Sequence, residues 1–432
     1  MQSAGIEGCG GAGFPSYAKL NEKADTIILN CAECEPLLKL HRQVLKKYAE
    51  KIMLGLESIR AAVGADRAIV AIKPSAKHTI EAIKYAIIEL NSISIGLLPE
   101  VYPAGDEVIA IYETTGRVVK PGALPISVGV IVYNVETVLN TYYAIENGAP
   151  VTGKYVTITG AVKNPATLYL PLGVAFSEVI DYCGGATIKD YALVCGGPMT
   201  GRVVSIYDVV TKTTNGLIIL PENHPVVLKK TQNLDISLKR GMSACCQCRM
   251  CTDLCPRHLL GHPIEPHKFM RNITTGNSMD VAAYEGTLYC SSCGLCEMYS
   301  CFQGLSPRSL IGLVKVELKK SGYTPGSADY EPVNPIREYR RISKNRLIAR
   351  LGLNEYNHQC YLDETEYPAS SVKIMLNQHI GAKSIPIVKE NDMVKKGDVI
   401  ANAIDGALSL PTHSSISGRI VKVTDSYITV ER

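Results

Sequence analysis

The stretch GMSACCQCRMCTDLCPRHLLGH, residues 241–262, holds five cysteines within eleven positions. Four of them follow the spacing C-x2-C-x2-C-x3-C, with a proline directly after the last. A second stretch, YCSSCGLCEMYSCF at residues 289–302, repeats the pattern as C-x2-C-x2-C-x4-C. Three closely spaced cysteines can wrap one side of an iron–sulfur cluster while the fourth ligand arrives from elsewhere. Structural zinc, the alternative, favours two separated CxxC pairs, so the spacing indicates 4Fe-4S clusters.

In two-cluster ferredoxins each run lends its last cysteine to the cluster of the other run. We therefore predict a ferredoxin-like α domain with two clusters over residues 235–325. The first cluster is assigned to Cys245, Cys248, Cys251 and Cys301. The second cluster is assigned to Cys290, Cys293, Cys296 and Cys255. Cys246 is expected not to be a ligand, because its use would break the matched spacing of the two runs.

The bulk composition excludes several classes of protein. The 45 Lys and Arg residues against 41 Asp and Glu residues leave a net charge of +4, too little for a nucleic-acid binder. We find no signal peptide and no run near 18 apolar residues, so we expect a cytoplasmic protein without a membrane span. In that reducing compartment, fifteen cysteines favour metal or redox chemistry over disulfides.

Residues 1–150 read as an α/β domain, the first part of a multidomain α/β and β fold. β-Branched apolar runs at residues 26–30, 67–73 and 128–134 alternate with helical patterns at residues 37–63, 79–90 and 135–145. Such alternation predicts a parallel, Rossmann-like sheet with helical crossovers.

The stretch GCGGAGFP, residues 8–15, matches G-x-G-x-x-G through Gly8, Gly10 and Gly13. Its glycines allow backbone N–H groups to approach a phosphate closely. Only seven residues precede it, so we do not expect the standard turn in which a strand leads into the glycines. A flexible N-terminus is the alternative interpretation.

Three further stretches accompany these glycines: NCAECEP at residues 30–36, YPAGDE at 102–107 and YNVETVLN at 133–140. Together they resemble the flavin- and NADH-binding subunit of respiratory complex I and the related Rnf-type (RnfC) subunits. The resemblance implies a domain that binds FMN and NADH over residues 1–150. It implies cofactor-binding positions at Gly8, Gly10, Gly11, Gly13, Lys19, Asn30, Glu33, Tyr102, Gly105, Asn134 and Thr137. It also implies that Phe14, Glu35 and Glu107 face the nicotinamide nucleotide.

This chain departs from the complex I pattern at Ala32 and Cys9, where complex I usually has an acid and an arginine. Details of the flavin contact therefore stay open. Cys31 and Cys34 form a lone CxxC pair, for which a thioredoxin-like role is the less favoured alternative.

The remaining segments resemble modules of the same families. Residues 151–222 resemble the SLBB domain, a β-grasp-like module, which we expect to be mainly a scaffold. Residues 326–368 are predicted to be a linker, and its basic run is expected to form a solvated helical face, with an acidic partner as the alternative. That run comprises Arg337, Arg340, Arg341, Lys344, Arg346 and Arg350. Residues 369–432 resemble the RnfC-type barrel-sandwich hybrid domain and are expected to serve docking or structure.

The order of these modules is similar, over essentially the whole chain, to that of the PduS-type cobalamin reductases of propanediol-utilising bacterial microcompartments. The resemblance implies an NADH-dependent cob(III)alamin/cob(II)alamin reductase that sends electrons through FMN and two 4Fe-4S clusters to a corrinoid substrate. It also implies a corrinoid adenosyltransferase and shell proteins as partners, and a location in or at a microcompartment. Two alternatives stay open: an Rnf-like NADH-linked conduit to a redox protein, and a non-catalytic microcompartment docking protein.

Overall fold

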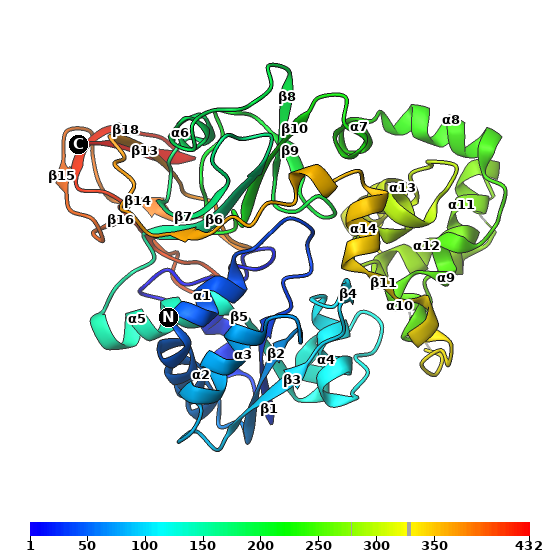
Figure 1. The fold of residues 1–432 in the computed structure, drawn as a ribbon, viewed down its shortest axis with the longest axis horizontal. Coiled ribbons are helices and arrows are strands. Elements are labelled where there is room, and N and C mark those ends of the chain that lie inside the picture. The colour runs from blue at the N-terminus through cyan, green and yellow to red at the C-terminus, as the bar shows by residue number, and fades with distance from the viewer. Residues whose placement is uncertain (278, 326–329) are drawn as a thin grey trace.

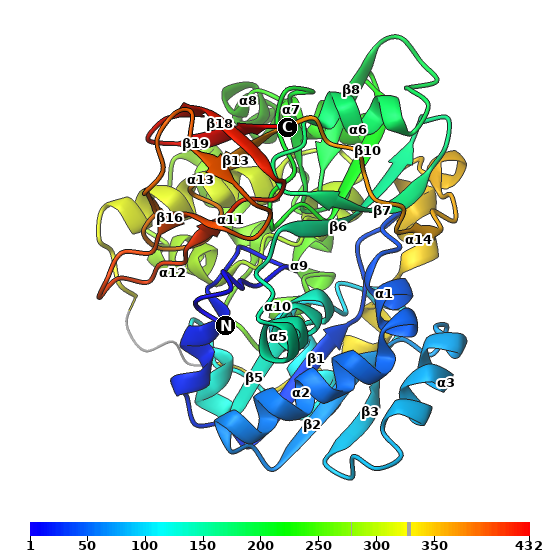
Figure 2. The same ribbon diagram turned by 90° about the vertical axis from the view of Figure 1, so that its left-hand side faces the viewer.

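The computed structural model describes residues 1–277, 279–325 and 330–432. Figure 1 shows the N-terminal α/β domain lying below a β domain, with the cysteine-rich helices at one end and the C-terminal β domain at the other. Figure 2, turned by 90°, places the N-terminus close to the C-terminal strands. Among the described residues, no helix combines the length and the apolar character needed to cross a membrane.

The N-terminal domain is built on a four-stranded parallel sheet in the order β3-β2-β1-β5. The strands are β1 (Thr26–Cys31), β2 (Arg67–Ile72), β3 (Ile93–Leu97) and β5 (Val130–Asn134). Ile27 and Leu29 pack against the helices of one face, whereas Ile28 packs against the other face. The first face carries α1 (His41–Lys47), α2 (Ala49–Val63), α3 (Lys77–Ala86) and α5 (Val135–Asn147), and the second carries α4 (Glu107–Thr115). The predicted Rossmann-like sheet is confirmed.

The helical pattern predicted over residues 37–63 is two helices. The chain leaves helical geometry at Tyr48, with φ −115° and ψ 32°, between α1 and α2. Gly64 then ends α2 with a φ of +74°, a left-handed conformation that glycine adopts without strain.

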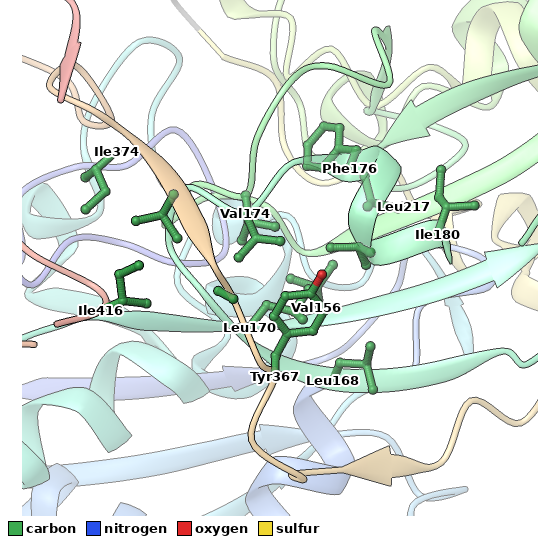
Figure 3. Packing of buried hydrophobic residues seen from close by; sticks show 14 of the residues in the cluster. Val156, Leu168, Leu170, Val174, Phe176, Ile180, Leu217, Tyr367, Ile374 and Ile416 are labelled. Atoms are coloured by element: carbon green, nitrogen blue, oxygen red, sulfur yellow. The ribbon is translucent and has the colours of Figure 1, made fainter. Parts of the chain in front are cut away.

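The β domain and the C-terminal domain share one hydrophobic core. A six-stranded sheet in the order β12-β7-β6-β10-β8-β9 forms the β domain, with α6 (Phe176–Tyr182) against it. Its strands are β6 (Gly153–Gly160), β7 (Ala166–Pro171), β8 (Tyr191–Cys195), β9 (Arg202–Val204), β10 (Gly216–Pro221) and β12 (Leu362–Asp363). Figure 3 shows Val174 and Phe176 of this domain in the same cluster as Ile374 and Ile416 of the C-terminal domain.

The C-terminal domain consists of two small sheets, in the orders β13-β19-β18-β15 and β14-β16-β17. The first contains β13 (Ser371–Met375), β15 (Met393–Val394), β18 (Gly418–Val423) and β19 (Tyr427–Glu431). The second contains β14 (Ile385–Pro386), β16 (Val399–Asn402) and β17 (Thr412–His413). The alternating burial of β13 and β19 places one face of the first sheet in the shared core.

The cysteine-rich module is helical. Its longer helices are α7 (Pro225–Thr231), α8 (Leu234–Ala244), α11 (Pro266–Thr275) and α13 (Pro307–Lys320). Shorter helices are α9 (Met250–Asp253), α10 (Pro256–Leu259) and α12 (Val281–Glu285). Phe269, Met270, Leu305, Leu310 and Ile311 form its small core.

Part of the predicted linker is regular, packed structure, although its first four residues lie outside the described ones. Strand β11 (Ile342–Ser343) pairs with β4 (Val101–Tyr102) of the N-terminal domain, and α14 (Lys344–Arg350) follows. Arg337 is buried and forms an ion pair with Glu113 of α4, and Arg341 lies 2.9 Å from the same carboxylate. The expectation that this basic run is a solvated face is therefore wrong for its first part, because Glu113 supplies a charge partner.

Candidate functional site

A cavity of about 1040 Å³ lies where three modules meet. Its floor is formed by the carboxyl ends of β1 and β5 at Asn30 and Asn134, together with the glycine-rich loop of residues 8–14. Residues 195–202 and 208–215 of the β domain form a second wall, and Ser291, Ser292 and Arg308 of the cysteine-rich module complete the cavity. Ligands bind at the carboxyl ends of parallel strands in open α/β sheets, so the position fits a nucleotide-like ligand.

The glycine-rich loop is held over the sheet by a few specific contacts. An isolated bridge between Glu7 and Pro15 closes it, and no strand leads into it, as expected. The Thr137 hydroxyl donates to the Glu7 carbonyl and accepts from the Cys9 amide, both at 3.0 Å. A Cβ at Gly10 would lie 2.5 Å from the Asn134 amide nitrogen, so only glycine fits there. The loop is thus held tightly against α5 and lines the cavity with backbone rather than with large side chains.

Two charged side chains, Lys19 and Glu107, line the cavity beside this loop. Lys19 donates to the Val132 carbonyl at 2.8 Å and lies 3.9 Å from the Glu107 carboxylate. Burial lowers the pKa of Lys19 and raises that of Glu107, and in each case the partner's charge opposes the shift. A cation and a carboxylate of perturbed pKa in one cavity are typical of a functional site.

The Glu35 carboxylate is held by the β domain, 164 residues further along the chain. It accepts hydrogen bonds from the Met199 amide at 3.0 Å, the Thr200 amide at 3.0 Å and the Thr200 hydroxyl at 2.6 Å. A Cβ at Gly197 would lie 2.0 Å from Glu35 Oε2, so this loop can approach only as glycine. Glu35 therefore fastens the β-domain loop across the mouth of the flavin-type domain.

The structure brings most of the predicted cofactor-binding positions to one cavity. Those that line it are Gly8, Gly10, Gly11, Phe14, Lys19, Asn30, Glu35, Gly105, Glu107, Asn134 and Thr137. Three others do not line it: Gly13 packs against the Gln378 carbonyl, Glu33 binds Arg42 at 2.5 Å, and Tyr102 is buried. The Tyr102 hydroxyl donates to the Cys293 carbonyl at 2.6 Å and so joins the N-terminal domain to the second cysteine loop.

The two cysteine loops share an unusual backbone. In each loop the second and fourth residues after the first cysteine have positive φ: Gln247 (53°) and Arg249 (66°), then Ser292 (57°) and Gly294 (82°). Such alternation turns successive amides toward one point and makes a cradle for an anion. The Ser292 amide donates to the Cys290 sulfur at 3.3 Å, a contact of the kind that tunes cluster potentials. The duplication seen in the sequence is thus also a duplication of conformation.

Each loop borders its own small cavity. The cavity of the first loop is lined by Cys245, Cys248, Cys251 and Cys301, and Cys246 and Phe302 line it as well. The cavity of the second is lined by Cys290, Cys293, Cys296 and Cys255. Burial, followed by Cys248, Cys245 and Cys301, raises the pKa of Cys251 to about 12, so these thiols are close neighbours. Both cavities hold the cysteine sets expected from crossed ligation.

The spacing of the thiols suits a cluster better than a single ion. Among the described residues, no three His, Cys, Asp or Glu side chains converge closely enough for one metal ion. The four thiolates of a 4Fe-4S cluster bind four separate iron atoms and so lie farther apart than the ligands of one tetrahedral ion. Here such a set of four lines each cavity, and Cys246 also lines the first. The residues present therefore fit 4Fe-4S clusters.

The two cavities differ in their surroundings. Ser291 and Arg308 line both the large cavity and the second cysteine cavity, so those two spaces share a wall. At the first cysteine cavity, by contrast, Cys246 and Cys248 are exposed and Phe302 is 59% exposed. The second site therefore lies beside the large cavity and the first lies at the surface.

Four family models match the chain. Residues 1–143 match the Nuo51 FMN-binding domain, 155–203 the SLBB domain, 244–306 a 4Fe-4S dicluster domain and 354–432 the RnfC barrel sandwich hybrid domain. The multidomain α/β and β fold expected from the sequence is confirmed.

Whole-chain relatives identify the family. The chain is 41% identical over 437 residues to "Cobalamin reductase PduS" of Citrobacter freundii, covering 100% of this chain and 95% of that protein. The chain belongs to the PduS family. The PduS protein of Salmonella typhimurium is 39% identical with the same coverage. A component of the Na(+)-translocating ferredoxin:NAD(+) oxidoreductase complex of Acetobacterium woodii is 35% identical, over 60% of this chain and 57% of that component. This PduS-family chain is thus an FMN and iron–sulfur electron-transfer reductase in its domain composition.

Sequence reasoning missed several residues of the large cavity. Ser291, Ser292 and Arg308 lie next to cluster cysteines or on the following helix, and nothing in their types marks them. The stretch CGGPMTG, residues 195–201, carried a signal in its three glycines, because a β-domain loop without side chains can approach a neighbouring surface.

Proposed function

We propose that the chain is an NADH-dependent corrinoid reductase that passes electrons from NADH through FMN and two 4Fe-4S clusters to cob(III)alamin or cob(II)alamin. A flavin supplies the conversion required, since it accepts two electrons together and releases them singly. The shared wall at Ser291 and Arg308 carries this proposal, because it puts a flavin-type cavity directly against a cluster site.

The residues that would hold FMN are those that line the floor of the large cavity. The loop amides around Gly10 would receive the phosphate, with Lys19 as the nearby cation. Asn30 and Gly105 are joined by a 3.0 Å hydrogen bond, which fixes the opposite rim. Phe14, 37% exposed at the cavity, offers an aromatic face to the nicotinamide nucleotide.

Electrons would pass from the flavin to the second cluster, then to the first cluster, and from there to the corrinoid. The cavity that would hold the second cluster shares a wall with the large cavity, whereas the one that would hold the first is lined by two exposed cysteines. The apolar side chains of Phe302 and Met242, 59% and 63% exposed, stand near the first loop and offer a surface on which a corrinoid can dock.

The relatives support the choice of acceptor, because two PduS proteins described as cobalamin reductases match the entire chain. Reduction towards cob(I)alamin makes a corrinoid adenosyltransferase the natural partner, and we place the protein in or at a propanediol-utilising microcompartment with shell proteins around it.

Anaerobic reconstitution tests the proposal. We expect about eight iron, about eight sulfide and one FMN per chain, with NADH bleaching the flavin and then the clusters. Cob(II)alamin or cob(III)alamin added afterwards should reoxidise the clusters as fast as the protein reduces the corrinoid in steady state. Zinc in place of iron, or clusters that stay oxidised after the flavin is reduced, would refute electron transfer from the flavin to the clusters. Reduction of a redox protein but of no corrinoid would refute the acceptor.

A further inference from the structure

Arg308 occupies an unusual place between the two redox sites. It lies in the first turn of α13 and is half-buried. It is one of the two residues that line both the large cavity and the second cysteine cavity, and it is the one that carries a charge. A permanent positive charge therefore stands in the wall between the flavin cavity and the second cluster site.

Arg308 has no side-chain hydrogen bond and no ion pair within the described part of the chain, in contrast to its neighbours. Arg257, which also lines the second cysteine cavity, lies 3.0 Å from Asp106. The Lys230 ammonium group donates hydrogen bonds to the carbonyls of Met199 and Gly201. Among these cations, Arg308 is thus the one whose guanidinium has no protein partner among the described residues and is available to a group bound in the cavity.

The stability of α13 does not account for a cation at this position. The N-terminus of a helix carries a partial positive charge and favours anions, so an arginine in the first turn is unfavourable. The helix already has its anion, because the Glu297 carboxylate accepts from the Ser309 amide at 2.8 Å and from the Ser309 hydroxyl at 3.0 Å. Arg308 also lies near a second cation, since burial, opposed by Glu35 and reinforced by Arg308, lowers the pKa of Lys230 to about 8.

We infer that Arg308 is a positioning residue for electron transfer, whose guanidinium stabilises the negative charge that the second cluster gains when it accepts one electron from the flavin. The inference rests on the proposed function. When one electron arrives, the cluster and its four thiolates become one unit more negative, and a fixed cation beside them offsets that charge without moving a proton. A unit charge roughly 10 Å away, at an effective dielectric constant of about 20, changes the ratio of reduced to oxidised cluster by roughly tenfold.

The experiment is a redox titration of the anaerobically reconstituted full chain, followed by electron paramagnetic resonance, for wild type, Arg308→Gln and Arg308→Lys. In Arg308→Gln the second cluster should be roughly tenfold less reduced at a given potential, which is a shift of about 59 mV to more negative values for a one-electron couple. The first cluster should titrate nearly as in wild type, and Arg308→Lys should restore most of the shift because it keeps the charge. Arg271→Gln is the matched control, since Arg271 is an exposed arginine of α11 and lines neither cavity.

The outcomes separate this inference from the proposed function. If NADH reduces the flavin of wild type but neither cluster, the proposed electron path from flavin to clusters is refuted. If wild-type clusters are reduced but the second cluster of Arg308→Gln titrates as it does in wild type and in Arg271→Gln, the electron path is supported and the role of Arg308 is refuted. An equal shift of both clusters, or a Lys variant that behaves like Gln, also overturns it, because a local charge effect predicts neither.

Discussion

Replacing the last cysteine of each run separately, as Cys301→Ser and Cys255→Ser, tests both the crossed ligation and the order of the clusters. Each small cavity is lined by three spaced cysteines of one run and the last cysteine of the other, and Cys246 also lines the first. Serine removes one thiolate of four, so each variant should lose one cluster and fall from about eight to about four iron per chain. Iron and sulfide analysis of anaerobically purified protein measures this loss.

The two variants should then behave differently with NADH. Cys301→Ser removes the surface cluster and leaves the one beside the flavin cavity, so NADH should still reduce the remaining cluster. Cys255→Ser removes the cluster beside the flavin and leaves the first one stranded, so the flavin should bleach while the remaining cluster stays oxidised on the same timescale. Cys246→Ser is the control and should retain both clusters. If Cys301→Ser eliminates the same cluster signal as Cys290→Ser, the ligation is not crossed, and if NADH reduces both single-cluster variants equally, the proposed order is wrong.

Three further predictions concern the modules around the clusters. Gly10→Ala places a Cβ 2.5 Å from the side-chain amide nitrogen of Asn134. It should raise the Kd for FMN roughly tenfold, about 1.4 kcal/mol, in a flavin-binding titration. The control Gly312→Ala, which has open space around it, should leave this Kd unchanged. Tyr102→Phe leaves the part-buried Cys293 carbonyl without its donor and should lower the free energy of unfolding by about 1 kcal/mol in denaturant titration. An unchanged value would contradict a stabilising role for this bond. Burial raises the pKa of Glu7 to about 7, above its usual 4.5, so its contribution to stability is present below about pH 4.5 and is lost as the pH rises through about 7. Lys212 and Lys154 oppose this shift, so Glu7→Gln also removes the carboxylate beside buried Lys212. The difference in thermal stability between Glu7→Gln and wild type should move in favour of the variant from pH 4.5 to pH 8, and an equal difference at both values would contradict this.

The spacing of cysteines and the periodicity of the first domain were sufficient to predict the cysteine-rich and α/β modules, because both signals are local, whereas the other two modules were expected only from a family resemblance. A cluster loop needs its ligands a few residues apart, and a parallel strand shows as a short apolar run. The paired cavities even contain the cysteine sets that the spacing indicates.

What the sequence could not show depends on partners far apart in the chain. Arg337 resembled a surface charge because Glu113, its partner, is 224 positions away. Glu35 resembled a free acid next to a nucleotide, yet the loop at Met199 and Thr200 binds it. Arg308 acquires its position only when α13 packs against the flavin cavity. No local pattern encodes such contacts, since burial and electrostatic neighbours are properties of the assembled tertiary structure.

The C-terminal β domain lies against the beginning of the chain: the Ile380 amide donates to the Gly13 carbonyl at 3.0 Å, and a Cβ at Gly5 would lie 2.9 Å from the Pro411 carbonyl oxygen. The glycine-rich loop of the flavin-type domain is therefore held in part by residues more than 360 positions later, so removal of the C-terminal domain should loosen this loop and expose the core that the two β domains share.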